Sequence, residues 1–433
     1  MPRLRACPGG PLGGTLELPG DKSQSHRALI LGALAEGTTE IRGLLDSADV
    51  QATARALDAF GIRVEPTQEA CRVTGGEWQS PAVPIDCGNS GTAARLLMGA
   101  AAGFAIEATF TGDDSLRRRP MDRVIRPLAR MGARFDGGDR LPVRLAGGGL
   151  GGIDFRNQFA SAQIKSAILI AGLRSRGPVR VVEPLPSRDH SEIMLAEFGC
   201  ELHVADGPHG RTVELGERRA LAACTVDIAR DPSSASFLWL AAAIVPGSEI
   251  RTPSVLVNPL RTGFLKALEE MGAEVELANE RVQSGEVVAD VTVRHSALQG
   301  VQVGAERIPA MIDEVPALAV AAAFADGETL IEGLAELRHK ESDRLGAIVA
   351  GLAACGVAAA ADGDSLRVFG RGGARGGAEV ASQGDHRIAM AFTTLGLAAS
   401  DPVVVDGAEM IATSFPAFVE TMRAAGAEID ELD

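Results

Sequence analysis

The sequence predicts an α/β protein with two domains, each built from three similar units. The main evidence is an internal repeat, in which a helix-like run ends in glycine and passes into a short strand-like segment. Its six glycines are Gly61, Gly132, Gly199, Gly272, Gly356 and Gly426, spaced 71, 67, 73, 84 and 70 residues apart. This spacing is longer than the roughly 20 to 50 residues of solenoid repeats, and six such units divide naturally into two domains of three.

The repeated glycine is expected to end each helix in the left-handed conformation, where a Cβ atom would be sterically penalised. The first two copies are Leu57–Val64 and Leu128–Phe135. Strand-like segments lie between the glycines, for example at Gly14–Pro19, Pro142–Ala146 and Val179–Val182. Each unit therefore combines strands with the glycine-ended helix.

Each unit also contains a second, almost wholly apolar helix that follows a short polar segment. The polar segments are residues 20–27, 87–92, 160–165, 230–236, 311–316 and 382–387. All six offer a Ser, Thr, Asp or Asn as an N-cap, and the apolar helix bodies predict burial in the core. Because the polar ends occupy equivalent points of a repeat, we expect them to line a cleft between the two domains that accepts negative charges.

The overall composition limits the classes of function. A net charge of −15 argues against a general nucleic-acid or anionic-membrane surface, so any anion site has to be local. The six cysteines show no CxxC spacing, which favours reduced thiols over disulfides or zinc. Apolar runs such as Phe237–Val245 are far shorter than the roughly 20 residues of a membrane helix, and no signal sequence is recognised. We expect a cytoplasmic enzyme.

The segment Arg338–Arg344 is the strongest candidate for a working centre. It holds three cations, two carboxylates and an imidazole directly before the apolar run Leu345–Leu352, so the charges open a helix. Cations there oppose the positive end of the helix dipole, and an anionic ligand would explain them; a solvated charged turn is the alternative. The chain is rich in arginine, and we expect its few lysines to be chemically required: Lys22, Lys165, Lys266 and Lys340.

Other polar helix starts allow both a functional and an ordinary interpretation. Lys22, Ser23 and Arg27 occupy a capped helix start suited to phosphate or carboxylate, and capping alone would not require the two cations. Gly88–Thr92 is typical of a small anion-binding turn, although weak evidence by itself. Arg117–Pro120 is expected in a polar loop, either solvated or providing one arginine as an anion clamp.

Asp313 and Glu314 precede a wholly apolar helix, where a carboxylate serves either as a general base or as an N-cap. Gly147–Gly152 matches G-x-G-x-x-G but leads into a strand-like segment, so the dinucleotide-binding interpretation fails. The sequence has no P-loop, HExxH or G-x-S-x-G motif. Metal, P-loop and serine-hydrolase chemistry therefore have no support.

Taken together, six ordered motifs closely resemble the EPSP synthase family, the 3-phosphoshikimate 1-carboxyvinyltransferases. They are Asp21–Arg27, Gly88–Thr92, Arg119–Pro120, Ser161–Gln163, Lys340–Arg344 and Asp385–Met390, and the similarity runs from about residue 12 to the C-terminus. The resemblance implies a two-domain inside-out α/β barrel, each domain having three βαβαββ repeats. It places one domain at residues 1–20 plus 230–433 and the other at 21–229, with hinge crossings near Gly20 and Arg230.

The resemblance also implies the reaction, in which the enolpyruvyl group of phosphoenolpyruvate is transferred to the 5-hydroxyl of shikimate 3-phosphate and phosphate is released. It implies Asp313, Glu341 and Lys22 as catalytic residues, and no metal or cofactor. Residues expected to hold shikimate 3-phosphate are Lys22, Ser23, Arg27, Ser161, Ala162, Gln163, Arg188, Asp313 and Lys340. Those expected to hold phosphoenolpyruvate are Lys22, Asn89, Gly91, Arg119, Gln163, Arg344 and Arg387. We expect a monomer whose only partners are its two small-molecule substrates. Binding to nucleic acid or to a membrane is not expected.

Three positions depart from the better-known branch of the family. Ala162 stands where Ser is common, Glu336 where Asn is common, and Thr413 where a Lys often contacts phosphoenolpyruvate. Arg188 offers a compensating cation toward the phosphate of the sugar acid. The pattern resembles the second bacterial branch of the family.

The sequence allows two rival interpretations. The related UDP-N-acetylglucosamine enolpyruvyl transferases carry a reactive Cys on a mobile loop, and Thr111–Pro120 contains none. The second rival is a non-catalytic anion-binding protein of the same fold. The sequence retains Lys22 together with the carboxylates Asp313 and Glu341, and anion binding gives no reason to keep carboxylates.

Overall fold

The structure is a computed structural model that describes residues 2–432, and its contacts divide the chain into two compact units. Unit 1 contains the described residues up to Pro19, Arg230–Arg281 and the described residues from Val287 onward. Unit 2 contains Gly20–Ala229 together with the short segment Val282–Glu286. The chain therefore passes between units after Pro19 and after Ala229, and the five-residue segment belongs to unit 2 although the residues on both sides belong to unit 1.

Unit 2 contains three four-stranded sheets and seven helices among its described residues. The helices are α1 (Lys22–Leu34), α2 (Ala48–Ala59), α3 (Gly91–Ala102), α4 (Asp114–Arg118), α5 (Asp122–Met131), α6 (Ala162–Gly172) and α7 (His190–Glu197). The sheets have the orders β14-β3-β5-β4, β6-β7-β9-β8 and β10-β11-β13-β12. The strands are β3 (Thr38–Arg42), β4 (Arg63–Pro66), β5 (Ala70–Thr74), β6 (Ile85–Asp86), β7 (Glu107–Thr111), β8 (Arg134–Gly137), β9 (Val143–Ala146), β10 (Ile153–Arg156), β11 (Val179–Glu183), β12 (Leu202–Gly207), β13 (Gly210–Leu215) and β14 (Thr225–Asp227).

Unit 1 repeats this plan with sheets ordered β2-β15-β17-β16, β18-β19-β21-β20 and β22-β23-β1-β24. Its helices are α8 (Pro232–Ile244), α9 (Gly263–Glu270), η1 (Ala305–Ala310), α10 (Val315–Ala323), η2 (Ala335–His339), α11 (Arg344–Ala354), α12 (His386–Gly396), η3 (Ala408–Thr413) and α13 (Phe418–Ala424), where η marks 3₁₀ helices. Its strands are β1 (Arg3–Cys7), β2 (Gly13–Thr15), β15 (Glu249–Leu256), β16 (Glu274–Gln283), β17 (Glu286–Arg294), β18 (Gln302–Val303), β19 (Asp326–Ile331), β20 (Ala358–Asp362), β21 (Ser365–Arg371), β22 (Glu379–Val380), β23 (Val403–Val405) and β24 (Glu428–Leu432). The tips of β16 and β17 fall within the segment assigned to unit 2.

All six sheets share one pairing pattern. The first two strands in each order are parallel, and the second and third are antiparallel. In the second repeat of unit 2 the elements follow one another as β6, α3, β7, α5, β8 and β9, with the short α4 inserted. The predicted α/β class and the βαβαββ repeat are confirmed.

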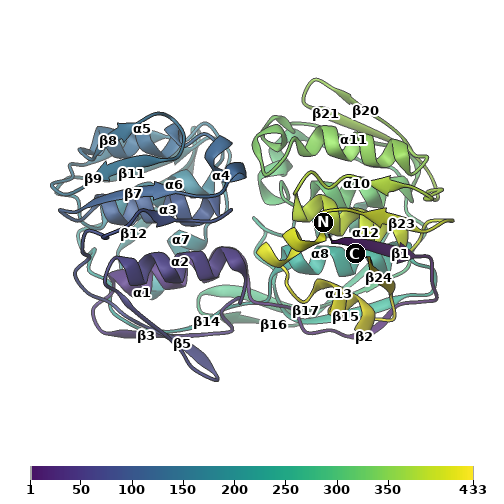
Figure 1. Cartoon of the computed structure of the whole chain (residues 1–433), viewed down its shortest axis with the longest axis horizontal. Coiled ribbons are helices and arrows are strands. Elements are labelled where there is room, and N and C mark those ends of the chain that lie inside the picture. The colour runs from purple at the N-terminus through teal and green to yellow at the C-terminus, as the bar shows by residue number, and fades with distance from the viewer. Residues whose placement is uncertain (1, 433) are drawn as a thin grey trace. The chain divides into compact units, whose positions relative to one another are not determined.

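Two strands are exchanged between the repeats that flank the crossings. β2 directly precedes α1 in the chain but pairs with β15 in unit 1, and β14 directly precedes α8 but pairs with β3 in unit 2. β1 pairs with β23 and with β24, so the first and last strands lie side by side in unit 1 (Figure 1). Unit 1 therefore depends on strands from both ends of the chain.

The predicted glycine caps are confirmed in all six copies. Each glycine follows its helix with a positive φ: 83° at Gly61, 116° at Gly132, 88° at Gly199, 95° at Gly272, 79° at Gly356 and 102° at Gly426. Other residues adopt this conformation only with strain. The repeat in the sequence therefore marks six equivalent helix ends.

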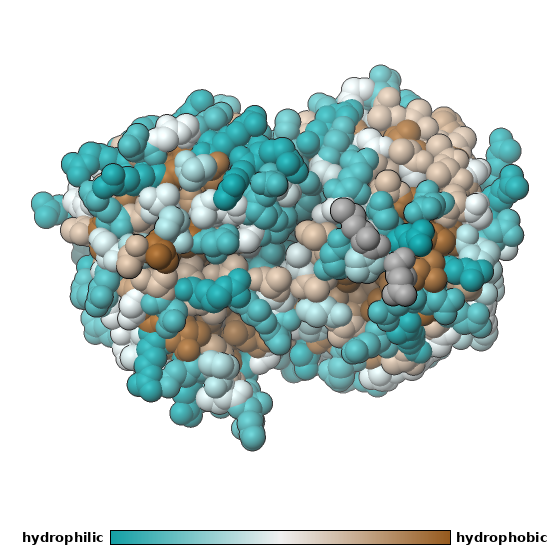
Figure 2. Space-filling view, in the orientation of Figure 1, coloured by the Kyte–Doolittle hydropathy of each residue, from teal (hydrophilic) through white to brown (hydrophobic). Residues whose placement is uncertain are grey.

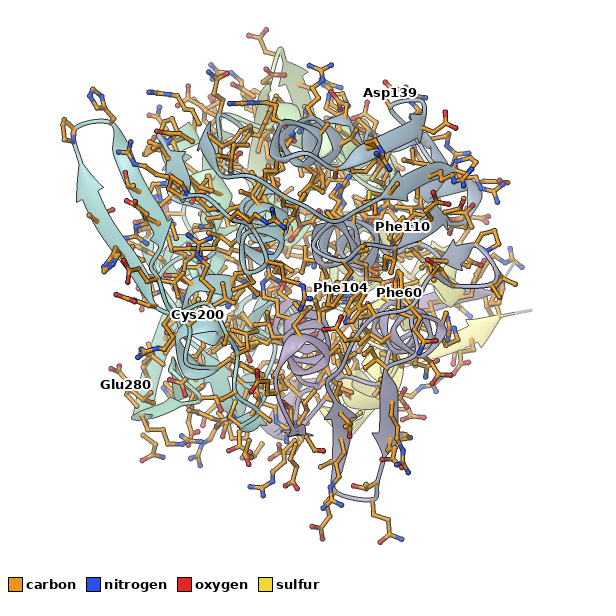
Figure 3. The ribbon with its side chains drawn as sticks, turned by 90° about the vertical axis from the view of Figure 1, so that its left-hand side faces the viewer. Phe60, Phe104, Phe110, Asp139, Cys200 and Glu280 are labelled. Carbon is orange, nitrogen blue, oxygen red and sulfur yellow. The ribbon has the colours of Figure 1, made fainter. Side chains whose placement is uncertain are left out.

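The predicted apolar helices form the two cores. In unit 2, Trp78 lies 4.7 Å from Phe60 and 5.3 Å from Phe104 between ring centroids, and Phe110 is 6.3 Å from Phe60. Figure 3 shows the three labelled phenylalanines among the helices of this unit. In unit 1, every residue of α8, α10 and α12 is buried. Within residues 2–432, no helix is long and apolar enough to cross a membrane.

The visible surface is mostly hydrophilic, with small groups of hydrophobic residues between the charged ones (Figure 2). The large exposed hydrophobic side chains lie in three strands, β12, β16 and β21, and in connecting segments: Val83, Phe159, Leu185, Val204, Leu277, Val282 and Phe369. Scattered exposure of this kind is ordinary for a folded protein.

Candidate functional site

The start of α1 holds the first group of predicted site residues in unit 2. The side chain of Asp21 caps the helix by accepting a hydrogen bond from the Gln24 N–H at 2.7 Å. Lys22 Nζ lies 3.1 Å from Asp49 Oδ2, and both side chains are mostly buried. Capping thus occupies Asp21, while the ammonium group of Lys22 is directed toward α2 and neutralised there.

Arg27, one turn further along α1, connects three segments of the predicted site. Its Nε donates to Ser191 Oγ and its Nη2 to Ser166 Oγ, both at 2.8 Å, while Nη1 donates to the carbonyl of Ser23 at 2.9 Å. The side chain is buried. Arg27 therefore fixes the start of α1 against α6 and α7.

His26 is buried beside these cations. Its Nδ1 is 2.7 Å from Thr53 Oγ1, and its Nε2 is 3.5 Å from Ser90 Oγ, the N-cap of α3. Burial, followed by repulsion from Lys22 and Arg27, lowers the pKa of His26 from 6.5 to about 3. The imidazole is therefore neutral at physiological pH and adds no further charge.

A second group surrounds the N-terminus of α3. Arg119 Nη2 donates to Asn89 Oδ1 at 2.6 Å and to Ser115 Oγ at 3.2 Å. A Cβ atom added to Gly91 would lie 2.8 Å from Arg95 Nη1 and 3.5 Å from Arg119 Nη1. Glycine at position 91 thus lets two arginines approach the start of the helix.

Gln163, at the start of α6, is hydrogen-bonded to α3. Its Oε1 accepts from Arg95 Nη1 at 2.6 Å, and its Nε2 donates to Thr92 Oγ1 at 2.8 Å. Its neighbour Ser161 is the N-cap residue of α6 and uses no side-chain capping bond. The carbonyl of Ser161 accepts from Asn157 Nδ2 at 3.0 Å.

Contacts between these residues form a polar network in unit 2. It joins the starts of α1, α3 and α6 with Ser191 in the first turn of α7, and Arg188 lies half-buried in the segment before α7. Backbone N–H groups at helix starts and several cations are the combination that binds phosphate and carboxylate groups.

Unit 1 contains a second network, centred on the buried side chain of Arg344. Its Nε donates to Asp385 Oδ2 at 2.7 Å, its Nη2 to Glu341 Oε2 at 2.5 Å and its Nη1 to Asp313 Oδ1 at 3.4 Å. Burial alone would lower the pKa of Arg344, but attraction to Asp385, Glu341 and Asp313 outweighs it and raises the pKa.

Asp313 also contacts the two other predicted cations of unit 1. Lys340 Nζ donates to Asp313 Oδ1 at 3.1 Å, and Arg387 Nη1 donates to the Asp313 carbonyl at 3.2 Å. Arg387 further pairs with Glu314 at 3.5 Å. The carboxylate predicted as a general base therefore has three cations around it, and the second predicted carboxylate, Glu341, shares Arg344 with it.

Two local predictions were wrong. Asp313, the Asp expected as a candidate N-cap before α10, does not cap it: Glu314 occupies the N-cap position and makes no side-chain capping bond, while the side chain of Asp313 contacts Lys340. Arg117 and Arg118 are not in a loop. They end the short helix α4, which Asp113 initiates by accepting from the Leu116 N–H at 2.7 Å.

Three charged residues of these networks were missed by sequence reasoning. Asp49 contacts Lys22, Arg95 contacts Gln163, and Asp385 contacts Arg344 while also capping α12. A lone arginine in the otherwise apolar start of α3 was a usable signal for Arg95. Asp49 and Asp385 look like ordinary first-turn and capping residues, and only tertiary contacts distinguish them.

Two residues at which the sequence departs from the better-known branch lie in 3₁₀ segments of unit 1. Thr413, at the end of η3, is buried and donates its hydroxyl to the Met410 carbonyl at 2.7 Å. Glu336 lies half-buried in η2.

Comparison with known proteins identifies the family. Residues 7–422 match the family model described as EPSP synthase (3-phosphoshikimate 1-carboxyvinyltransferase). The chain is 53% identical over 431 residues to a 3-phosphoshikimate 1-carboxyvinyltransferase of Phenylobacterium zucineum, covering 98% of this chain and 95% of the relative. It is also 53% identical over 437 residues to that of Caulobacter vibrioides strain NA1000, covering 99% of both.

A solved structure agrees with the sequence comparisons. The EPSP synthase of Acinetobacter baumannii superposes with a TM-score of 0.88 at 38% identity, with all of both chains covered. The fold, the six motifs and the two polar networks are thus accompanied by similarity along nearly the whole chain. The chain belongs to the EPSP synthase family.

Proposed function

We propose that this protein transfers the enolpyruvyl group of phosphoenolpyruvate to the 5-hydroxyl of shikimate 3-phosphate, giving 5-enolpyruvylshikimate 3-phosphate and phosphate. The support is membership of the EPSP synthase family together with the chemistry of the two networks. The two substrates bring two phosphates and two carboxylates, which require many cations. The predicted site residues include the cations Lys22, Arg27, Arg119 and Arg188 in unit 2, and Lys340, Arg344 and Arg387 in unit 1.

The proposal divides these residues between the substrates. Shikimate 3-phosphate would contact Lys22, Ser23, Arg27, Ser161, Ala162, Gln163, Arg188, Asp313 and Lys340. Phosphoenolpyruvate would contact Lys22, Asn89, Gly91, Arg119, Gln163, Arg344 and Arg387. Both sets draw on both units, so the reaction needs the two networks to act on one pair of substrates.

In the addition step, the 5-hydroxyl oxygen attacks C2 of phosphoenolpyruvate and loses its proton, while C3 gains a proton. We assign the base to Asp313, which Lys340 and Arg344 hold in place at 3.1 and 3.4 Å. A carboxylate orientated by two cations is suited to a hydroxyl proton, provided that the substrate places its hydroxyl within hydrogen-bonding reach.

In the elimination step, C3 loses a proton and the bond from C2 to the phosphate oxygen breaks, so the double bond is restored and phosphate leaves. The group at C3 must therefore both give and take a proton. We assign Glu341 to this role, with Lys22 as a cation or proton carrier at the phosphate. The contact of Glu341 with Arg344 orientates its carboxylate.

The observation that carries the proposal is the pair of carboxylates, Asp313 and Glu341, on one cation cluster. A protein that only binds anions gains nothing from them, because each carboxylate repels the ligand. The test is phosphate release from phosphoenolpyruvate, measured with shikimate 3-phosphate and in parallel with UDP-N-acetylglucosamine. We expect release only with shikimate 3-phosphate. Release only with the second acceptor, or with neither by a folded protein that binds anions, would refute the proposal.

The proposal includes a monomeric, cytoplasmic enzyme whose partners are its small-molecule substrates alone. Light scattering coupled to size exclusion tests the first part. A mass of about 45 kDa is expected from the 44.9 kDa chain, with and without both substrates. A mass of twice that value would refute it.

A further inference from the structure

A buried charged cluster in unit 2 lies outside the groups assigned to the reaction. Lys165, on α6, has no exposed side-chain surface, and its Nζ lies 2.7 Å from Glu183 Oε2 and 2.6 Å from Glu192 Oε1. Both carboxylates are also buried. Apart from Ser166, its neighbours from Ile164 to Gly172 are apolar, so Lys165 occupies a position where the core would accept a hydrocarbon side chain.

A contribution to folding stability does not explain these three buried charged groups. Removing three charged groups from water costs more than one ion pair returns, and apolar residues of similar volume often give equal or higher stability. Burial alone would lower the pKa of Lys165, but attraction to Glu192 and Glu183 raises it; burial raises the pKa of Glu192. Lys165 therefore stays positively charged. Stability does not explain why two glutamates are buried around it.

Glu183, at the end of β11, connects this cation to two segments of the proposed site. Its Oε1 accepts from Ser187 Oγ at 2.6 Å and from Asn157 Nδ2 at 2.8 Å, and its Oε2 accepts from the Ser187 N–H at 3.2 Å. Lys165 Nζ also points to the Ser187 carbonyl at 3.4 Å. Both sides of the Ser187 backbone are therefore held by the cluster.

Each held residue adjoins a group proposed to contact shikimate 3-phosphate. Ser187 directly precedes Arg188, and Asn157 donates a second bond to the carbonyl of Ser161 at the start of α6. Position errors of about 1 Å in such groups can lower binding or rate about a hundredfold. The cluster thus controls the spacing between Arg188 and Ser161.

The side-chain hydrogen bonds on the phosphoenolpyruvate side of unit 2 are made outside the cluster. Gln163 is hydrogen-bonded to Arg95 and Thr92 on α3, and Arg119 to Asn89 and Ser115. None of these bonds involves Lys165, Glu183 or Glu192. Disturbing the cluster should therefore weaken the binding of shikimate 3-phosphate more than that of phosphoenolpyruvate.

We infer that Lys165, Glu183 and Glu192 are positioning residues that hold Arg188 and the start of α6 in the arrangement that binds the phosphate of shikimate 3-phosphate. The inference rests on the proposed function, because it takes shikimate 3-phosphate as the ligand of these segments. It assigns no proton transfer to the cluster.

The test compares binding of shikimate 3-phosphate alone, by calorimetry, with steady-state KM values for each substrate at saturating levels of the other. Lys165→Met is expected to weaken binding of shikimate 3-phosphate by about tenfold or more. Ser187→Ala, which removes one hydroxyl contact of Glu183, should weaken it about threefold to tenfold. The KM for phosphoenolpyruvate should change by less than about twofold, a small effect on this scale.

Ser175→Ala is the matched control. Ser175 follows the other end of α6, and its hydroxyl donates to the Gly172 carbonyl at 3.0 Å, outside the cluster. We expect wild-type binding from this variant. Should Lys165→Met fail to fold, Ser187→Ala decides the question alone.

Three outcomes would overturn the inference. The first is that Ser187→Ala binds shikimate 3-phosphate as tightly as the wild type. The second is that the variants raise the KM values for both substrates equally and also lower the melting temperature, which would indicate that the cluster only supports the fold. If the wild-type protein itself binds no shikimate 3-phosphate, the proposed function fails first, and the inference fails with it.

Discussion

Replacing His26 with glutamine should remove a large pH dependence from the stability of unit 2. The imidazole has a pKa of about 3 when folded and about 6.5 when unfolded. Between these values the unfolded chain binds a proton that the folded chain does not, so stability is complete above pH 6.5 and falls as the pH falls. The shift of 6.5 − 3 = 3.5 units corresponds to a limit of about 5 kcal/mol, at 1.36 kcal/mol per unit.

A measurable part of this change in unfolding free energy appears at mild pH. From pH 7 to pH 5 the unfolded histidine goes from about one quarter to nearly fully protonated, while the folded histidine stays neutral, which costs about 2 kcal/mol. Glutamine can hydrogen-bond to Thr53 and Ser90 but does not titrate. The difference in unfolding free energy between wild type and His26→Gln should therefore change by about 2 kcal/mol over this range.

The two tryptophans allow the units to be observed separately. Trp78 lies in the core of unit 2 and Trp239 in that of unit 1. With Trp239→Phe as the common background, fluorescence during urea unfolding reports unit 2 through Trp78 alone. Parallel pH curves for the two proteins, separated by a constant difference, would show that His26 is not held neutral and would refute the reasoning.

Two further predictions concern the reaction. Glu341→Gln should bind both substrates with near-native affinity but turn over at least about a hundredfold more slowly in a phosphate-release assay, and unchanged turnover would remove Glu341 from the mechanism. Gly91→Ala should raise the KM for phosphoenolpyruvate about tenfold, because its Cβ would lie 2.8 Å from Arg95 Nη1 and disturb the bond of Arg95 to Gln163. Gly138→Ala, which meets nothing within 4 Å, is the control; equal KM values for these two alanine variants would contradict the steric argument.

Features with a local cause were predictable from the sequence. The repeat glycines cap helices because only glycine adopts their φ without strain, and this rule needs no knowledge of the rest of the fold. Apolar helix bodies likewise predicted the cores. Val143–Ala146 and Val179–Glu183 formed strands within about one residue of the expected segments.

Tertiary competition explains what the sequence did not predict. Asp313 had the right residue type for an N-cap, but Glu314 occupies the N-cap position, and Lys340 and Arg344, about thirty residues away in the chain, contact the carboxylate of Asp313. Asp49 and Asp385 could not be recognised because their partners are similarly distant. The sequence offered candidates for these contacts, and only the fold selects among them.

The pairing of β1 with the last strands of the chain has a consequence for synthesis on the ribosome. Unit 2 has all its strands, including β14, once residue 229 has emerged, apart from the short segment Val282–Glu286. Folding during translation proceeds mostly from the N-terminus. Leu4 and its neighbours, by contrast, pair with Val403–Val405 and Glu428–Leu432. The first strand to be made must therefore remain unpaired until nearly the whole protein has been translated, so the earliest residues are among the last to fold.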